Sequence, residues 1–253
     1  MDLYVERAGT GRPFVWAHGL TSSIAAERDT GIFRWEDVPG IDVIRYDARG
    51  HGRSPAGASP EDHQWSRLAD DLVAVADACS AESFVAGGAS MGCATALYAA
   101  LREPARVQSL VLAIAPTAWE TRATQTEAYL KSVGYLEANG LDAFLEASRK
   151  LPPQPAWTAA NREVRYRHLA GADPAALALA LRGAAQSNLP PRDEVATIGV
   201  PALLLAWDGD PGHPLSTAES LHELLGASEL LVARSPDDVA AWPQAVAEFL
   251  RPA

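Results

Sequence analysis

The sequence predicts an α/β protein with a doubly wound, mostly parallel sheet and an inserted helical cap. Its short apolar segments are continuous and rich in Leu and β-branched residues, which is typical of strands buried on both faces. Helical patterns alternate with these segments, as a parallel sheet requires. A helical stretch of roughly 70 residues then breaks the alternation, and one crossover needs far fewer. We therefore expect a core of residues 1–116 and 191–253 and a cap of residues 117–190.

The predicted core elements bring several polar residues to one edge of the sheet. Ligands of such sheets bind beyond the carboxyl ends of the strands, and His18, Ser90 and Asp210 each follow a strand. The expected strands cover residues 3–7, 13–17, 41–46, 83–87, 107–114, 201–207 and 229–233. The expected core helices cover residues 66–79, 91–101, 217–225 and 240–250.

The predicted cap contains four helical segments. Gly140, the pair Pro152-Pro153 and Gly171 separate them, because glycine and proline punctuate helices. The alternative is that these segments are ordinary helices packed on the sheet. The segments are residues 121–133, 142–150, 159–169 and 174–186.

The most informative stretch is Gly88-Ala89-Ser90-Met91-Gly92, which lies between a strand and an Ala-rich helix. The pattern G-x-S-x-G in this context indicates a nucleophile elbow, a strained turn that exposes the serine Oγ. Glycine at both outer positions removes the Cβ atoms that would block so tight a turn. The N–H groups that begin the helix favour negative charge nearby. Ser90 is therefore the predicted nucleophile.

Composition and charge narrow the function classes. The chain has 253 residues, of which 48% are hydrophobic and 21% charged, as in an ordinary globular protein. Its net charge of −11 argues against a nucleic-acid partner. The sequence has no membrane-length apolar run and no secretory signal. Cys79 and Cys93, the only two cysteines, indicate neither a disulfide framework nor a metal site. We expect a cytoplasmic protein without a metal or cofactor.

Four motifs follow one another along the chain: His18-Gly19-Leu20, Asp47-Ala48-Arg49-Gly50-His51-Gly52-Arg53-Ser54, Gly88-Ala89-Ser90-Met91-Gly92 and Asp208-Gly209-Asp210-Pro211. Together they resemble the motifs of the α/β-hydrolase superfamily over essentially the whole sequence. The resemblance implies that Ser90 is the nucleophile and that the backbone N–H groups of Leu20 and Met91 form an oxyanion hole. It also implies that the histidines and charged residues of the first two motifs hold loops rather than touch substrate.

The resemblance also implies an acid after the penultimate strand and a histidine after the last one. Asp210 fits the acid best because it precedes Pro211, and Asp208 is the alternative. The histidine is missing from its expected place, since no histidine follows His222. A carboxylate there would be a poor general base for a hydroxyl, because its pKa in water lies near 4.

His213 is the first candidate to replace the missing base. It follows Asp210 in the same loop, and Gly212 gives that loop the freedom to turn the imidazole toward the nucleophile. Three alternatives stay open at this point. His213 has only a local packing role, His63 or His168 reaches in from a flanking segment, or no base is present.

The leading functional hypothesis is a cofactor-free hydrolase of esters or thioesters that acts through an acyl-Ser90 intermediate. The alternative is a non-hydrolytic relative of the fold, either a small-molecule binding protein or a lyase or isomerase. Trp119 and Trp157 are the preferred candidates to line an apolar substrate pocket, ahead of Trp16 and Trp207, because they fall in the predicted cap. The expected partner is a small-molecule substrate with an apolar part, and self-association is left open.

Overall fold

The computed structural model describes residues 2–251, and a sheet of seven strands forms the centre of that part of the chain. The strand order is β1-β3-β2-β4-β5-β6-β7, and every neighbouring pair is parallel except β1 and β3. This arrangement confirms the predicted fold class. The strands are β1 (Val5–Gly9), β2 (Arg12–Ala17), β3 (Ile41–Tyr46), β4 (Phe84–Ala89), β5 (Val107–Ala113), β6 (Ala202–Trp207) and β7 (Ser228–Ala233).

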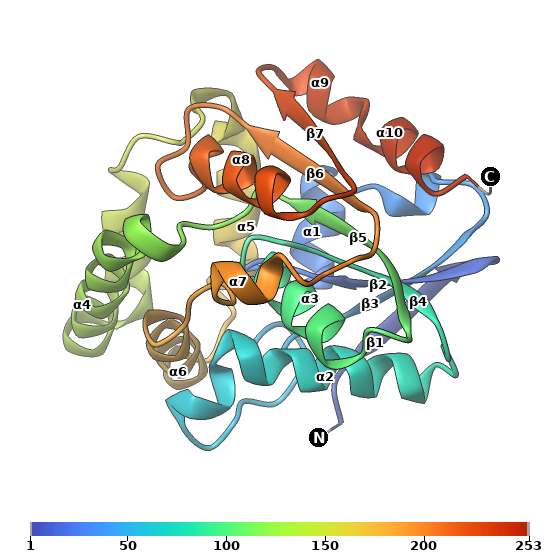
Figure 1. Cartoon of the computed structure of the whole chain (residues 1–253). Helices are drawn as coiled ribbons and strands as arrows, with labels where there is room; N and C mark the ends of the chain where they lie inside the picture. The colour runs from blue at the N-terminus through green and yellow to red at the C-terminus, as the bar shows by residue number, and fades with distance from the viewer. Residues whose placement is uncertain (1, 252–253) are drawn as a thin grey trace.

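Helices cover both faces of the sheet and gather beyond one of its ends (Figure 1). The first three are α1 (Ile24–Thr30), α2 (Trp65–Ala78) and α3 (Met91–Arg102). Between β5 and β6 come α4 (Arg122–Arg149), α5 (Ala159–Leu169), α6 (Pro174–Ala185) and α7 (Arg192–Val195). The last three are α8 (Leu215–Leu224), α9 (Pro236–Ala240) and α10 (Trp242–Phe249).

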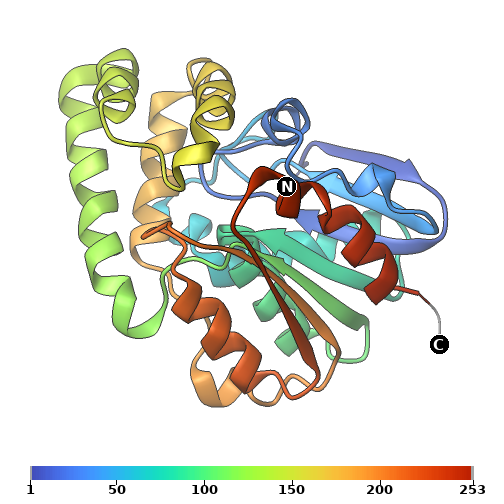
Figure 2. The same cartoon turned by 90° about the horizontal axis from the view of Figure 1, so that it is seen from above.

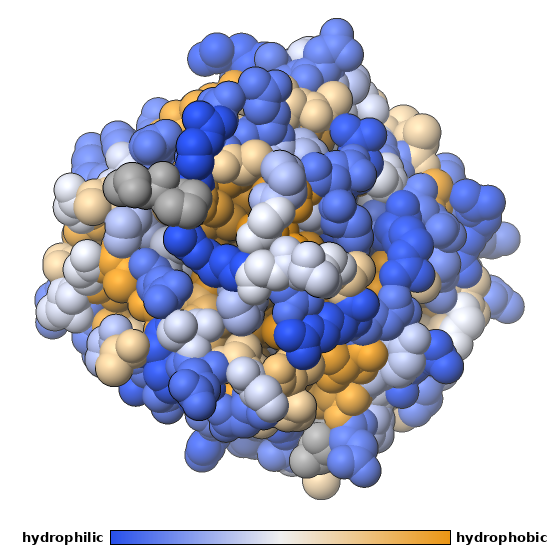
Figure 3. All heavy atoms as spheres, turned by 90° about the vertical axis from the view of Figure 1, so that its right-hand side faces the viewer, coloured by the Kyte–Doolittle hydropathy of each residue, from blue (hydrophilic) through white to orange (hydrophobic). Residues whose placement is uncertain are grey.

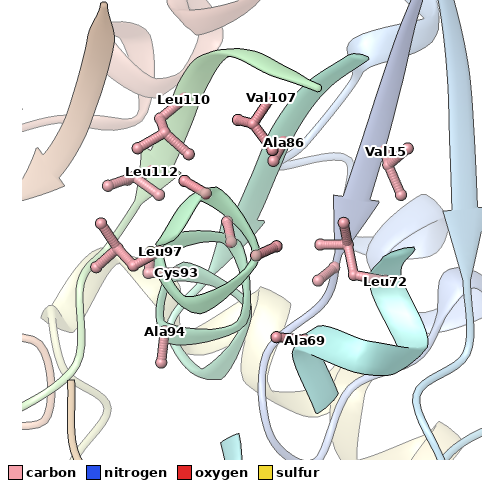
Figure 4. Close-up of a cluster of buried hydrophobic side chains, with 14 of the residues drawn as sticks. Val15, Ala69, Leu72, Ala86, Cys93, Ala94, Leu97, Val107, Leu110 and Leu112 are labelled. Atoms are coloured by element: carbon pink, nitrogen blue, oxygen red, sulfur yellow. The ribbon is translucent and has the colours of Figure 1, made fainter. Parts of the chain in front are cut away.

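The central strands are buried on both faces, so alternate side chains of one strand enter different apolar clusters. On β2, Val15 packs into the cluster that contains α2 and α3, whereas Phe14 and Trp16 pack into the cluster that contains α10. Figure 4 shows the first cluster, in which Leu97 of α3 lies near Leu112 of β5. This two-sided burial explains why the strand sequences are continuous rather than alternating in hydropathy.

The helices α4, α5 and α6 lie together at one end of the sheet (Figure 2). They share a small apolar cluster of their own, which includes Val133, Leu145, Leu169 and Leu181. These helices are not isolated from the core, because α5 packs on α1 and α6 packs on the short helical turn Pro60–His63. The division into a core and a cap of residues 117–190 therefore stays a prediction.

Some helices agree with the sequence prediction and others differ from it. The expected helices 121–133 and 142–150 lie within α4, and a kink at Gly140 (φ 80°, ψ 171°) separates them as predicted. The expected helix 240–250 corresponds to α10, and the short helix α9 before it was not predicted. Helix α1 was not predicted, although Ser23 caps its start by accepting from the N–H of Ala26, and Gly31 ends it with φ 64°.

The surface is mostly hydrophilic on the face seen in Figure 3, where apolar residues form separate small groups. Within residues 2–251, no helix has the length and apolar character needed to cross a membrane.

Candidate active site

The turn between β4 and α3 has the geometry of a nucleophile elbow. Ser90 has φ 53° and ψ −111°, a strained conformation for a residue with a side chain. A Cβ on Gly88 would lie 2.4 Å from the carbonyl carbon of Gly92, and one on Gly92 would lie 2.0 Å from the carbonyl oxygen of Ala17. Both glycines are therefore required by close backbone approach, and together they allow the turn that presents Ser90 at the edge of the sheet.

Ser90, His213 and Asp210 form one hydrogen-bonded chain. The Ser90 Oγ lies 2.9 Å from Nε2 of His213, and Nδ1 of His213 lies 2.7 Å from Oδ2 of Asp210. A carboxylate only accepts hydrogen bonds, so Nδ1 carries the proton and Nε2 is free to accept from the serine hydroxyl. This is the arrangement in which an imidazole can remove a serine proton and a carboxylate can stabilise the resulting imidazolium.

The turn after β6 explains how a histidine three positions after the acid reaches the serine. The N–H of His213 donates to the carbonyl of Asp210 (3.1 Å), and the N–H of Gly212 donates to Oδ1 of Asp210 (2.8 Å). The N–H of Thr117 donates to the Gly212 carbonyl (3.2 Å), which ties the turn to the segment after β5. The loop therefore folds back on itself and directs the His213 ring toward Ser90.

Asp210 is held as an anion. Burial alone raises the pKa of Asp210, but hydrogen bonds from the His213 ring, the Gly212 N–H and the Trp207 indole N–H outweigh this effect and lower it below its ordinary value. The Asp210 side chain is 9% exposed. The alternative acid, Asp208, accepts from the N–H of the adjacent Gly209 and has no contact with a histidine among the described residues.

The backbone N–H groups of Leu20 and Met91 are available beside Ser90. Met91 is the first residue of α3, so its N–H has no partner within the helix. Leu20 follows Gly19, and a Cβ on Gly19 would lie 3.5 Å from the Cβ of Ser90. Within residues 2–251, neither N–H donates a hydrogen bond. These two donors stay the predicted oxyanion hole.

The histidines of the first two motifs contact the backbone instead. The Ala48 N–H donates to Nε2 of His18 (2.9 Å), and the Thr21 N–H donates to Nε2 of His51 (3.3 Å). Burial lowers the pKa of His18 to about 4 and that of His51 to about 3, so both rings are neutral near pH 7. These are the contacts of loop-holding residues.

The remaining histidines are engaged away from Ser90. His63 accepts from the Gly57 N–H (3.1 Å), His168 pairs with Asp29 (2.8 Å), and His222 bonds to the Ser228 hydroxyl (2.8 Å). The structure thus brings His213 to Ser90 and leaves both other candidate bases elsewhere.

A cavity of about 310 Å³ opens beside the serine. This volume is at the lower end of ligand sites, which favours a small ligand. Leu20, Ser90, Asp210 and His213 reach it together, and α4 and α5 supply much of the opposite wall. The apolar lining comes from Leu20, Ile32, Phe33, Ile114, Tyr129, Phe144, Leu181 and Trp207.

The two tryptophans preferred from the sequence do not line this cavity, and that prediction was wrong. The Trp119 indole N–H donates to the Pro190 carbonyl (3.0 Å), and Arg192 lies over its ring at 4.1 Å. Trp157 packs edge-on against Trp207 at 5.4 Å, so Trp207 faces the cavity and Trp157 supports it from behind.

Three charged residues at this cavity were not predicted from the sequence, namely Glu27 of α1 and Arg162 and Arg165 of α5. None of them belongs to a motif, and α1 was not predicted. Within residues 2–251, no group of three or more histidine, cysteine or acidic side chains is arranged to hold a metal ion.

Comparison with known proteins identifies the family. Residues 12–235 match the family model described as alpha/beta hydrolase fold, and the chain belongs to this family. It is 26% identical over 232 residues to a Bacillus subtilis protein provisionally named 2-succinyl-6-hydroxy-2,4-cyclohexadiene-1-carboxylate synthase, covering 89% of this chain and 83% of the relative. It is 28% identical over 199 residues to 3-oxoadipate enol-lactonase 1 of Acinetobacter baylyi, covering 75% of this chain and 69% of that protein.

The fold is also close to that of solved structures. An enol-lactonase from Burkholderia xenovorans LB400 superposes with a TM-score of 0.83 at 19% identity, covering 98% of this chain and 96% of that chain. At this identity the likeness establishes the shared fold alone.

Proposed function

We propose that this chain is a serine hydrolase of small carboxylic esters, thioesters or lactones and that it acts through an acyl-Ser90 intermediate. The observation that carries the proposal is the hydrogen-bonded chain from the Ser90 Oγ through His213 to Asp210, at 2.9 and 2.7 Å. Membership of the α/β-hydrolase fold family and a relative named as an enol-lactonase support hydrolysis of an acyl bond.

In the proposed reaction, the Ser90 Oγ attacks the carbonyl carbon while its proton passes to Nε2 of His213. The N–H groups of Leu20 and Met91 stabilise the charge that develops on the carbonyl oxygen. The protonated His213 then gives its proton to the leaving group, and the acyl group stays on Ser90. A water molecule, activated by the same imidazole, releases the acid and restores the hydroxyl.

A fluorophosphonate probe with mass mapping tests whether the serine is activated, because such probes phosphonylate nucleophilic serines. We expect labelling at Ser90 in the native chain and none in Ser90→Ala. We also expect Ser90→Ala to lower the hydrolysis of small activated esters by at least about two orders of magnitude. Undiminished turnover by Ser90→Ala would contradict the proposal.

One observation favours a second candidate function. A relative that matches 89% of this chain is provisionally named a synthase rather than a hydrolase. If this chain has an activity of the same kind, it is a non-hydrolytic enzyme that uses the polar site without forming an acyl-enzyme. Absence of probe labelling and of an acyl-Ser90 adduct during turnover would favour this second candidate.

A further inference from the structure

Arg165 is a cation without a protein partner inside the cavity beside Ser90. It lies on α5, and its side chain lines the cavity together with Asp210 and His213. Within residues 2–251, Arg165 makes no hydrogen bond and no ion pair. Arg165 is exposed to solvent, and the protein that surrounds this part of the cavity lowers the pKa of its guanidinium from the ordinary value.

The other charged groups that line the cavity have partners. Glu27 accepts from the Trp16 indole N–H (2.8 Å) and pairs with Arg45 (2.8 Å). Asp210 is held by His213 and by the neighbouring N–H groups described above. Arg162 donates to backbone carbonyls near the end of α4, including that of Leu151. Arg165 is thus the cavity charge that the described part of the chain leaves unmatched.

The position of Arg165 on α5 directs it into the cavity. Asn161, Arg162 and Arg165 all line the cavity, and the spacings of three and four residues to Arg165 place the three on one side of the helix. Asn161 donates to the Thr30 carbonyl (2.9 Å), so its contact with α1 holds this side of the helix over the active site. Because Arg165 is exposed to solvent, water hydrates its guanidinium when no ligand is bound, and a bound anion can replace that water with charge-assisted hydrogen bonds.

We propose that Arg165 binds a carboxylate at the far end of the substrate, so that the substrate is a small ester, thioester or lactone that also carries a carboxylate. This inference rests on the proposed function and specifies its substrate class. The planar guanidinium matches a carboxylate with two parallel hydrogen bonds. A phosphate dianion fits less well, because the site offers one unmatched positive charge and holds the Asp210 carboxylate close by.

The rest of the cavity fits the remainder of such a molecule. Phe33, Phe144 and Leu181 supply apolar surface for a short carbon chain between the scissile carbonyl and the carboxylate. The volume of about 310 Å³ limits that chain to a few carbons.

The test compares two series of methyl esters of short dicarboxylic acids. In one series the second acid group is a free carboxylate, and in the other it is a carboxamide of nearly the same shape. Acid release gives kcat/KM for each ester, and the ratio of carboxylate to carboxamide measures the selectivity for charge. Because both esters are measured on the same variant, this ratio is insensitive to partial misfolding.

We expect the native chain to favour the carboxylate and Arg165→Gln to lower the selectivity ratio by about 10- to 100-fold, mainly through KM. Arg165→Lys keeps the charge without the planar fork and should lie between the two. Arg167→Gln is the matched control, because Arg167 is an exposed arginine on the opposite side of the same helix. It should leave the ratio unchanged. An unchanged ratio in Arg165→Gln, or equal losses in both variants, would overturn the proposal.

A binding measurement separates this inference from the proposed function. Calorimetric titration of Ser90→Ala with glutarate and with its monoamide needs no turnover. We expect Ser90→Ala to bind glutarate more tightly than the monoamide and this preference to disappear in the double variant that also carries Arg165→Gln. That result supports the carboxylate site even if no ester is hydrolysed. Equal affinity for the two compounds contradicts the carboxylate site even if Ser90-dependent hydrolysis is observed.

Discussion

The histidines in the loops after β2 and β3 differ from the histidine in the turn after β6 in the groups that their ring nitrogens contact. In the loops after β2 and β3, His18 and His51 are 2% and 7% exposed and bond to backbone groups. In the turn after β6, the His213 side chain is 22% exposed, and its two nitrogens contact a hydroxyl and a carboxylate. A buried ring between backbone groups stays neutral and holds a loop, whereas a ring between Ser90 and Asp210 can gain and lose a proton during a reaction.

The largest expected effect is on activity and separates His213 from the other two candidate bases, His63 and His168. His213→Gln should lower kcat/KM for small esters by about 10,000-fold, because the serine loses its proton acceptor. His63→Gln and His168→Gln, assayed in parallel, should stay close to the native value. Loss of activity in either of these variants, with His213→Gln fully active, would place the base elsewhere. Full activity in all three would exclude a histidine base.

The next largest loss of activity is expected when the acid, Asp210, is replaced. Asp210→Asn should lower kcat by about 1,000-fold, since an amide can donate to Nδ1 and so favour the tautomer with the proton on Nε2, which cannot accept from Ser90. The change in shape is small, so the melting temperature serves as the control for folding. Activity within a few-fold of native would show that Asp210 does not orient His213.

Features of the site that depend on local sequence could be predicted, whereas those that depend on distant contacts could not. The elbow and the Asp210–His213 turn are local, since glycine spacing and a three-residue separation within one loop determine them. The directions of Trp119 and Trp157 depend on Pro190, Arg192 and Trp207, which are distant in sequence or lie on other elements. Composition alone therefore could not distinguish an indole that lines the cavity from one that supports its wall.

Arg165 illustrates the same limit for charge. A sequence with many arginines gives no sign of which one lacks an acidic partner, because the pairing depends on how α5 packs on α1. Helix α1 was missed for a related reason. It is only two turns long, and the signals at its ends, Ser23 and Gly31, are also common in loops.

The buried pair of histidines should affect stability rather than turnover. The pKa of His18 is about 4 when folded and about 6.5 when unfolded, so the unfolded chain binds more protons between these values. The stabilisation from the neutral ring is therefore complete above about pH 6.5 and is lost as the pH falls through about 4. Over this range it should amount to about 3 kcal/mol.

Urea unfolding of the native chain and of His18→Gln between pH 7.5 and pH 4 checks this expectation. The glutamine variant lacks the titrating group, so the difference in free energy of unfolding between the two proteins should shrink as the pH falls. A difference that stays constant or grows toward low pH would show that the His18 ring is not held neutral.

The smallest expected effect tests the choice between the two aspartates after β6. Asp208→Asn should leave kcat/KM within about twofold of the native value, because within residues 2–251 the exposed Asp208 carboxylate accepts a hydrogen bond only from the N–H of Gly209. The substitution keeps the shape of the side chain and its ability to accept that hydrogen bond, so the φ of 82° at Gly209 and the turn beyond it are preserved. It removes the same unit of charge as Asp210→Asn from a position two residues earlier, and the two variants form a matched pair. A large loss in Asp208→Asn with Asp210→Asn nearly active would reverse the assignment of the acid. Similar moderate losses in both would mean that the negative charge of the loop, rather than a hydrogen bond to His213, supports the imidazolium.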